Sequence, residues 1–381
     1  MEQVPLDVCQ QPRWANLDQL AAVRKELAAR PGLVKLADVV YLRSMLAKVA
    51  AGQANVMQAG DCAESFAECT PGYLARKAGL LEVLAGVLKM STHKPVVRAG
   101  RLAGQFAKPR SSVSEYVNGQ DLPTYRGEMV NSSEPDPLGR RPDPRRMLLG
   151  YDAAKAAMSY LGWHARPIDP PLWTSHEALL LDYETPLVRR DGDGRLLLSS
   201  THWPWIGERT RHPDGPHVAL LAEVMNPVAC KIGPDITVDE LLALSDRLDP
   251  DRQAGRLTLI ARFGACRVAE RLPALVSAVS AAGHPAIWLT DPMHGNTVLT
   301  PDGVKTRFLT TITQEVRDFQ IAVRSVGGIA GGLHLETTPD QVTECVSDNS
   351  ELGRVSDKYT SLCDPRLNPC QAVSVVSSWS G

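Results

Sequence analysis

The hydrophobic positions of the chain fall into short apolar runs that stop at Gly, Asp, Arg or His, with amphipathic stretches between them. Short runs rich in Val, Ile and Leu are typical of buried parallel strands, whereas a 3.6-residue periodicity indicates helices. The runs predict strands at 54–60, 95–101, 195–200, 226–233, 256–263, 284–291 and 328–336, and a weaker one at 360–364. The stretches between them predict helices at 73–90, 148–162, 174–188, 216–225, 237–247, 265–282, 311–325, 339–346 and 368–378.

This alternation of strand and helix predicts parallel βαβ units. About eight repetitions favour an α/β fold of the closed (β/α)8 TIM-barrel type over an open sheet. Residues 1–50 carry helical patterns at 17–29 and 37–50, and we expect them to form an N-terminal helical extension to a catalytic barrel spanning 51–381. Residues 108–147 are rich in Pro, Gly, Arg and Asp, which predicts a long structured loop over a site.

The composition narrows the classes of partner and compartment. The chain has 381 residues, of which 44% are hydrophobic and 22% charged, as in ordinary globular proteins. Its 41 Lys and Arg face 43 Asp and Glu, so no general basic field favours nucleic acid or an anionic membrane. The sequence shows no signal-peptide pattern, no apolar run of about 18 residues, and eight scattered cysteines without CxxC spacing. We therefore expect a cytoplasmic protein with free thiols, one of them available to a metal.

Metal-competent side chains stand at the ends of four different predicted strands: Cys62, His294, Glu336 and Asp364. In a closed barrel the C-terminal strand ends converge on one mouth. A mixture of sulfur, nitrogen and oxygen donors suits Mn²⁺, Co²⁺, Fe²⁺ or Zn²⁺ better than Mg²⁺ or Ca²⁺. The alternative is a buried cysteine, a rim histidine and two loop-capping carboxylates. Ligands so far apart are no local metal signature, so the residues alone leave both interpretations open.

A second group at or near the strand ends is cationic: Arg101, Lys108, Arg110, Arg209, Lys231 and Arg262. Burying any of these cations alone would be costly, so a cluster of them calls for anionic partners. Arg suits bidentate binding of phosphate or carboxylate, and Lys acts as a compact point charge. Solvated surface charge is the alternative, but these cations follow apolar runs and adjoin Gly or Pro.

Several long motifs occur in a fixed order: QAGDCAESF, RAGRLAGQFAKPRS, YRGEMVN, WIGERTR, NPVACKIGP, ARFGA, DPMHGNT, KTR, GGLHLETT, VTEC and CDPRLN. In this order they resemble the type II 3-deoxy-D-arabino-heptulosonate 7-phosphate (DAHP) synthases. The resemblance runs from about residue 10 to 379, nearly the whole chain. It implies a (β/α)8 transferase that condenses phosphoenolpyruvate with erythrose 4-phosphate and releases phosphate, the first step of the shikimate pathway to the aromatic amino acids.

The resemblance also implies roles for particular residues. Cys62, His294, Glu336 and Asp364 match the ligands of a divalent metal, for which we expect Mn²⁺ or Co²⁺, with Zn²⁺ and Fe²⁺ as alternatives. The phosphoenolpyruvate site is matched by Arg101, Glu208, Arg209, Lys231 and Arg262, and the place of the second phosphorylated substrate by Lys108, Arg110 and Ser111. Catalytic roles are expected for Cys62, Glu208, Lys231 and His294. The family pattern favours a homodimer or homotetramer, with no nucleic-acid or membrane partner.

Two departures from the family pattern suggest a specialised role. The segment 160–175 and the N-terminal extension are shorter than is usual, and these are regions that help to form effector sites. We therefore expect a weakly regulated enzyme that feeds a secondary pathway, of the phenazine or antibiotic type. Two alternatives stay open: an amino-DAHP synthase that uses an imine acceptor, and a non-catalytic partner that activates a chorismate mutase. Cys363 adjoins Asp364 and is expected to lie close enough to Cys62 to form an oxidised link.

Overall fold

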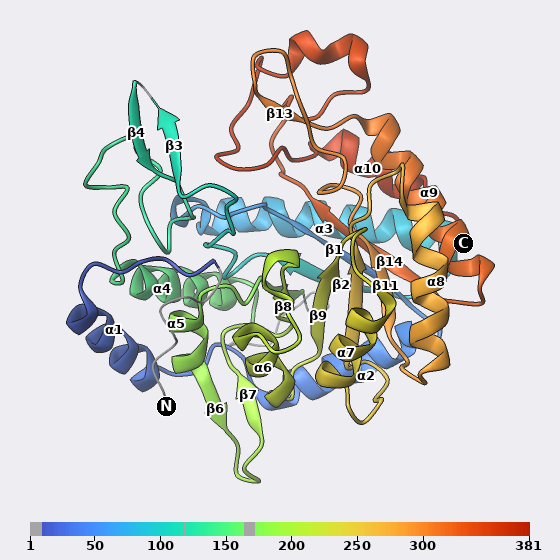
Figure 1. Cartoon of the computed structure of the whole chain (residues 1–381), viewed down its shortest axis with the longest axis horizontal. Helices are drawn as coiled ribbons and strands as arrows, with labels where there is room; N and C mark the ends of the chain where they lie inside the picture. The colour runs from blue at the N-terminus through green and yellow to red at the C-terminus, as the bar shows by residue number, and fades with distance from the viewer. Residues whose placement is uncertain (1–9, 118, 164–171) are drawn as a thin grey trace.

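Eight parallel strands form a barrel in the computed structural model, which describes residues 10–117, 119–163 and 172–381 (Figure 1). Neighbouring strands follow the order β5, β2, β1, β14, β11, β10, β9, β8. The ring closes where Glu177, after β5, bridges Trp205 of β8 in parallel and Ala178 N donates to Trp205 O at 3.0 Å. The strands are β1 Asn55–Gly60, β2 Val96–Arg101, β5 Trp173–Ser175, β8 Trp205–Ile206, β9 Val228–Ile232, β10 Leu257–Ala261, β11 Ile287–Thr290 and β14 Ala330–Glu336. The predicted (β/α)8 fold is confirmed.

The register of the strands brings their C-terminal ends level. Gly60 pairs with Glu336 on one side and with Arg101 on the other, so these three residues share one height at the barrel mouth. Gly60 has φ +146°, and a Cβ there would lie 2.7 Å from the carbonyl oxygen of Arg101. Only glycine allows this close approach. Every residue of β9 and β10 is buried, as expected for parallel strands covered on both faces.

A helix follows each barrel strand on the outside of the ring. Their starts are set locally: Thr70 caps the first of them with Pro71 in the first helical position, and Asn368 and Gln371 form a capping box on the last. The helices are α3 Pro71–Thr92, α4 Arg146–Tyr160, α5 Leu181–Glu184, α6 Pro216–Glu223, α7 Val238–Leu248, α8 Val268–Ala281, α9 Leu309–Ser325 and α10 Pro369–Ser377. All but α5 confirm predicted helices to within a few residues.

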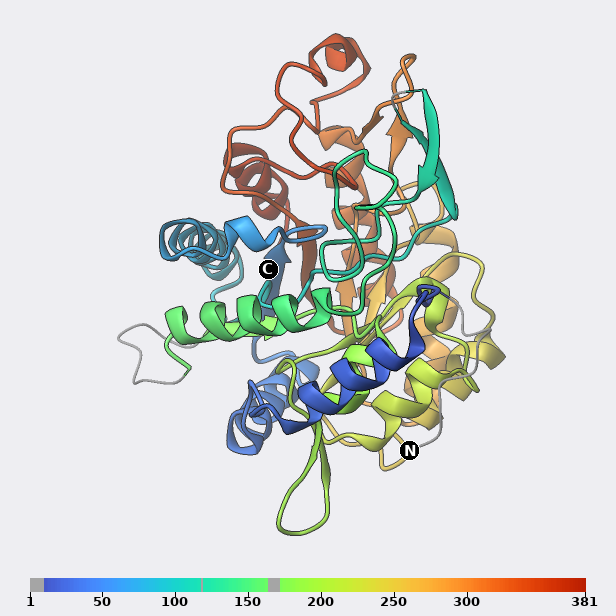
Figure 2. The same ribbon diagram turned by 90° about the vertical axis from the view of Figure 1, so that its left-hand side faces the viewer.

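Two helices precede the barrel, α1 (Leu17–Ala29) and α2 (Leu36–Ala50), as predicted. α2 lies across the N-terminal end of the barrel, away from the mouth (Figure 1). Its buried Leu42, Leu46 and Val49 share one apolar cluster with the first residues of several strands. α1 packs beside α4 (Figure 2).

Two predictions between residues 174 and 200 are wrong. The segment 174–188 is not a helix: it holds most of β5, the single turn of α5, the turn η2 (Thr185–Leu187) and the start of β6 (Val188–Arg190). The run at 195–200 gives β7 (Leu196–Leu198), which pairs antiparallel with β6 and does not enter the barrel. The Asp-Gly-Asp-Gly turn between β6 and β7 closes a hairpin. The apolar residues of β7 therefore pack outside the ring. The strand that does enter the barrel is β8, which follows β7 in the chain.

The predicted helix at 339–346 and the weak strand at 360–364 are also wrong. Both segments are irregular, with bends and an isolated bridge from Val346 to Phe308, and the short helix η4 (Asn349–Arg354) lies between them. The buried carboxylate of Glu344 accepts the backbone N–H groups of Thr360 and Ser361 at 3.1 and 2.8 Å. This backbone is therefore paired with a side chain and needs no neighbouring strand.

Connections on the mouth side carry two β-hairpins. Strands β3 (Ser114–Val117) and β4 (Gln120–Pro123) lie in the long loop 108–147, and β12 (Val298–Leu299) pairs with β13 (Lys305–Thr306). Both hairpins project on the side opposite α2 (Figure 1). Short 3-10 turns follow two barrel strands, η1 at Phe66–Glu68 and η3 at Glu208–Thr210. Within the described ranges, no helix has both the length and the apolar character needed to cross a membrane.

Candidate functional site

A cavity of ≈ 310 Å³ opens at the C-terminal ends of the barrel strands. All four predicted metal ligands and all five residues predicted for phosphoenolpyruvate line it, together with Lys108. Its walls are formed by Cys62, Arg101, Gln105, Lys108, Pro109, Glu177, Trp205, Gly207, Glu208, Arg209, Lys231, Arg262, His294, Thr297, Lys305, Glu336 and Asp364. Arg110 and Ser111 are outside this lining, and the Arg110 guanidinium pairs with Glu115 of β3 at 3.0 Å.

Three of the four predicted ligands meet at one point of the mouth, and the fourth, His294, lies beside two of them. Donor atoms of Cys62, Glu336 and Asp364 lie within 4.8 Å of one another. His294 Nε2 is 3.1 Å from Glu336 Oε1 and 4.0 Å from Asp364 Oδ2. One sulfur, one imidazole nitrogen and two carboxylates so arranged fit a divalent transition metal or zinc. The arrangement favours the metal interpretation over that of unrelated core and rim residues.

The orientation of His294 is set by Asp291, which directly follows β11. Asp291 Oδ2 is 2.7 Å from His294 Nδ1, and Oδ1 accepts the backbone N–H of His294 at 3.2 Å. Burial would raise the pKa of Asp291, but His294 and Lys231 hold that pKa well below its usual range. Because Nδ1 is occupied, Nε2 faces Glu336. The acid at the strand end in DPMHGNT was the sequence signal for this role.

Glu336 is shared by two buried arginines. Arg101 Nη2 lies 3.0 Å from Oε1, and Arg307 Nη1 lies 2.7 Å from Oε2. Burial would raise the pKa of Glu336, but His294, Arg307 and Arg101 together hold it well below the usual range. The carboxylate is therefore ionised and ready to act as a ligand. Sequence reasoning missed Arg307, although it ends the KTR motif.

Two lysines approach Asp364. Lys108 Nζ contacts both Asp364 Oδ2 and Cys62 Sγ, and Lys305 Nζ lies 2.8 Å from Asp364 Oδ1. Burial lowers the pKa of Lys108, but the two anionic partners outweigh burial and raise it. The structure thus places Lys108 against the ligand cluster. Lys305, on β13, is a further cation at the mouth that sequence reasoning did not single out.

The cations predicted for phosphoenolpyruvate form a wall beside the predicted ligands, since Arg101 contacts Glu336 and Lys231 Nζ lies 3.4 Å from His294 Nδ1. Arg101 and Lys231 flank the ring of Trp205, with the Cζ and Nζ atoms 5.3 and 5.9 Å from its centroid. Burial lowers the pKa of Lys231 even though Asp291 lies 2.8 Å away. Arg262 donates to the backbone oxygen of His294 at 3.3 Å, so this wall joins the ligand cluster directly.

Two carboxylates face these cations. Glu208 lies 3.0 Å from Arg211, and Glu177 is partly buried. Among the described residues, neither Glu208 Oε2 nor Glu177 Oε1 has a hydrogen-bond partner, and burial raises the pKa of both side chains. A Cβ at Gly207 would lie 2.0 Å from Glu177 Oε1, so a larger residue there would displace this carboxylate. Glu177 was missed because its segment reads as a helix, whereas it follows strand β5.

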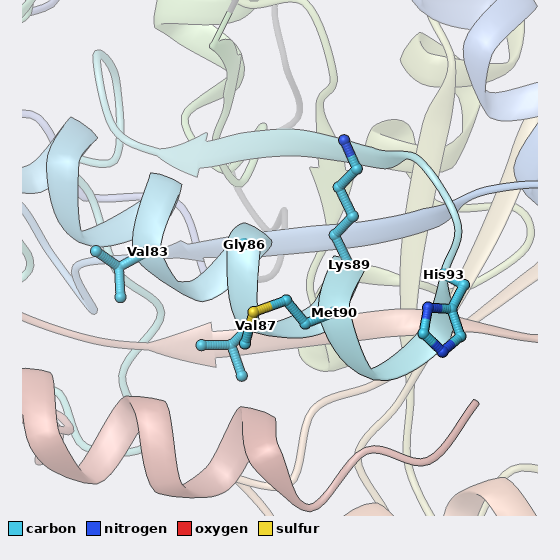
Figure 3. Close-up of a pocket in the computed structure, with 6 residues that line it drawn as sticks. All are labelled: Val83, Gly86, Val87, Lys89, Met90 and His93. Carbon is cyan, nitrogen blue, oxygen red and sulfur yellow. The ribbon is translucent and has the colours of Figure 1, made fainter.

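A second hollow lies along the C-terminal half of α3, in the connection between β1 and β2. Its lining is Val83, Gly86, Val87, Lys89, Met90 and His93 (Figure 3). None of these residues lines the mouth, and the side chains are mostly apolar. The chemistry is therefore assigned to the barrel mouth.

A buried acid links the connections after β10 and β11. Glu315 Oε1 accepts the N–H of Gly264 at 2.9 Å, and Oε2 accepts from Asn296 Nδ2 at 2.5 Å. These partners stand two residues after Arg262 and His294 respectively. Burial raises the pKa of Glu315 to about 8, against the effect of the Asn296 hydrogen bond.

Glu315→Gln is expected to change how stability depends on pH. The folded-state pKa of about 8 exceeds the unfolded value near 4.5, so the native chain binds the extra proton between these values. This contribution is complete below about pH 4.5 and is lost as the pH rises through 8. Between pH 5 and pH 9 the free energy of unfolding of the wild type should therefore fall, relative to that of the variant, by on the order of 4 kcal/mol.

Urea unfolding of both proteins at each pH tests this expectation. The hydrogen bond that Gln can no longer accept shifts all values equally, so only the pH dependence of the difference is diagnostic. A difference that stays constant from pH 5 to 9 would contradict the assignment.

Cys363 lies against Cys62 at the edge of the ligand cluster. Besides burial, Cys363 raises the pKa of the Cys62 thiol, whereas Cys62 lowers the pKa of Cys363, and both thiols are free. Arg110 Nη1 also approaches Cys363 Sγ at 3.8 Å. The oxidised link expected from the sequence stays a prediction.

Air oxidation of metal-free protein should join Cys62 to Cys363, with oxygen as the oxidant. A bound metal would protect the Cys62 thiolate. Peptide mass mapping before and after oxidation checks this, and Cys363→Ser serves as the control that cannot form the link. Finding Cys62 unlinked after oxidation would count against the expectation.

Comparisons with known proteins agree with this geometry. Residues 4–167 and 163–378 match the Class-II DAHP synthetase family. A probable phospho-2-dehydro-3-deoxyheptonate aldolase of Pseudomonas fluorescens is 55% identical over 378 residues, covering 98% of this chain and 94% of its own. A phospho-2-dehydro-3-deoxyheptonate aldolase of Streptomyces coelicolor is 37% identical over 422 aligned positions, covering 97% and 94%. The solved structure of a phospho-2-dehydro-3-deoxyheptonate aldolase from Francisella tularensis shares the fold, with TM-score 0.56, 14% identity and coverage of 94% and 95%.

Proposed function

Because this chain belongs to the Class-II DAHP synthetase family, we propose that it is a DAHP synthase acting on phosphoenolpyruvate and erythrose 4-phosphate. The observation that supports this proposal is that one cavity is lined both by four metal-competent residues and by a group of cations. The reaction forms a bond between C3 of phosphoenolpyruvate and the aldehyde carbon. Water then adds at C2, and cleavage of the C2–O bond releases phosphate.

The cations would offset the repulsion between the two phosphorylated substrates of this reaction. Two phosphorylated anions must touch in a cavity of low dielectric, where their repulsion is strong. Arg209, Lys231 and Arg262 would bind the phosphate of phosphoenolpyruvate, with Arg101 on its carboxylate side. Lys108, with Arg110 and Ser111 at the rim, would serve the second phosphate, although Lys108 must then leave its contact with Asp364.

Cys62, His294, Glu336 and Asp364 would hold a divalent metal, Mn²⁺ or Co²⁺ by preference, with Zn²⁺ and Fe²⁺ also fitting the donors. When bound, such a metal supplies Lewis-acid polarisation of the aldehyde oxygen. Asp291 keeps His294 turned toward this position through Nδ1.

The unpaired carboxylate oxygens suit the water step. Glu177 Oε1 and Glu208 Oε2 are enclosed near the cations and lack partners within the described part of the chain. Either oxygen would accept a hydrogen bond from the water that attacks C2 and take up its proton. Lys231, whose pKa is lowered by burial, would hold the substrate as a point charge close to that water.

The proposal is tested by incubating the enzyme with both substrates and Mn²⁺, and measuring phosphate release and product mass. A product with the mass of DAHP and one phosphate per turnover is expected. A separate reaction with the imine acceptor distinguishes the amino-DAHP alternative. No phosphate release with either acceptor would favour the non-catalytic chorismate mutase partner, against which the presence of all four donors argues.

We further propose that this protein is a short, weakly regulated form of the family that serves a secondary pathway. The family match divides at residues 163–167, inside the segment 160–175, of which residues 164–171 lie outside the described part of the structure. The Streptomyces alignment spans 422 positions against 381 residues here, so that relative carries insertions. Activity should stay nearly unchanged with Trp, Phe and Tyr, added singly and together, and strong inhibition by any of them would overturn this part.

A further inference from the structure

A chain of buried, alternating charges runs behind the ligand cluster. It connects Glu344, Arg366, Asp61, Lys77 and Glu68, in that order. The first four are at most 6% exposed. Two of its members adjoin predicted ligands, since Asp61 directly precedes Cys62 and Arg366 follows Asp364 by two residues.

The central contact joins two segments far apart in sequence. Arg366 Nη1 donates to Asp61 Oδ1 at 3.1 Å. The rest of the guanidinium makes a forked pair with Glu344, with Nη2 at 2.8 Å and Nε at 3.1 Å. On the other side, Lys77 Nζ lies 2.5 Å from Asp61 Oδ2. Every charge in this line thus has an opposite neighbour, which a buried charge requires.

Glu344 also fixes the fold of the segment that carries Asp364. Besides the guanidinium it accepts the backbone N–H of Thr360, Ser361 and Arg366. Ser361 Oγ in turn donates to Asp364 O at 2.7 Å. The segment has no strand or helix to pair its backbone N–H groups, so the carboxylate of Glu344 accepts them instead.

The ligand cluster joins segments that are far apart along the chain, so the separation of its donor atoms depends on how those segments are held. Three acidic side chains, Cys62, Glu336 and Asp364, bring their donor atoms within 4.8 Å. Backbone hydrogen bonds from Thr337 to Gly60 and from Leu367 to Glu336 hold the strand ends, but they do not reach Asp364 itself.

We propose that Asp61, Arg366 and Glu344 are positioning residues that set the separation of Cys62 and Asp364 before any metal binds. The inference rests on the proposed function, because it takes these two side chains as ligands. Partners behind metal ligands commonly change metal affinity by about 10- to 100-fold when they are removed.

Arg366→Lys keeps the positive charge but removes the planar guanidinium that hydrogen-bonds Asp61 and Glu344 at the same time. In full-length protein stripped with a chelator, this variant should bind Co²⁺ about 10- to 100-fold more weakly than the wild type. Its thiolate-to-Co²⁺ absorption band should shift, and Cys62 should be alkylated faster in the absence of metal. Asp61→Asn tests the same contact from the other side, with a smaller loss, should Arg366→Lys fail to fold.

Arg256→Lys is the matched control. Arg256 is also buried, but its guanidinium donates to the carbonyls of Leu248, Val224 and Leu221 near the N-terminal end of the barrel. It should lower the unfolding temperature without changing the Co²⁺ affinity or the alkylation of Cys62.

The inference is wrong if both Arg366→Lys and Asp61→Asn bind Co²⁺ as tightly as the wild type and their Cys62 is alkylated at the wild-type rate. The backbone alone would then hold Cys62 and Asp364 in place. Equal weakening by Arg256→Lys would overturn the inference too, as general destabilisation. If the wild type itself binds no Co²⁺, the proposed metal site fails, and the alkylation rates still decide whether the charge chain positions Cys62.

Discussion

Replacing His294 with Ala is expected to lower phosphate release from phosphoenolpyruvate and erythrose 4-phosphate by about 10³-fold or more. The change removes the imidazole nitrogen that lies 3.1 Å from Glu336, the one nitrogen donor among the predicted ligands. Metal polarisation of a carbonyl is worth several kcal/mol in the transition state, and each 1.4 kcal/mol is about a factor of ten. Phosphate release at saturating substrate and Mn²⁺ measures the effect.

His93→Asn provides the matched control for this change. His93 is exposed at the end of α3, has φ +57°, and is outside the mouth; Asn tolerates this backbone angle. It should keep wild-type activity. If His294→Ala folds normally and keeps more than a tenth of the activity, His294 has no essential role.

Glu336→Gln is expected to lower the free energy of unfolding by about 3–5 kcal/mol, and to abolish activity as well. Arg101 and Arg307 are 2% and 0% exposed at their side chains and share this carboxylate. Without it, both guanidinium groups stay buried with too little opposite charge. Urea unfolding of metal-free protein measures the loss without the contribution of a bound ion.

A second substitution separates the two effects of Glu336→Gln. Adding Arg307→Met removes one of the two unpaired cations, so part of the lost stability should return while activity stays absent. Unchanged urea resistance in the single variant would show that Glu336 does not balance these arginines.

The sequence predicted the barrel because its central strands carry their own signal. β9 and β10 are buried on both faces, so they appear as uninterrupted apolar runs. β5 and β8, with three and two residues, are too short to show any period, and the neighbouring run of β7 is more apolar. The errors at 174–188 and 195–200 therefore come from strands that tertiary closure defines and local sequence does not.

The sequence could predict those site residues whose position follows from the end of a barrel strand. Cys62, Lys231, His294 and Glu336 stand at or just after apolar runs, and a barrel brings such positions together whatever their separation along the chain. Asp364 was placed there by a predicted strand at 360–364 that does not exist, and the resemblance of the motif CDPRLN pointed to the same residue. Their partnerships were not predictable, because contacts such as Glu336 with Arg307 or Asp61 with Arg366 depend on how the loops fold over the mouth.

The central claim is that one divalent metal, held by four distant residues beside the cationic wall, is required for the reaction. The most direct test is phosphoenolpyruvate consumption with erythrose 4-phosphate after chelation, and again after addition of Mn²⁺ or Co²⁺. We predict that consumption stops on chelation and returns with either ion. Full consumption by protein shown to contain no metal would contradict the account.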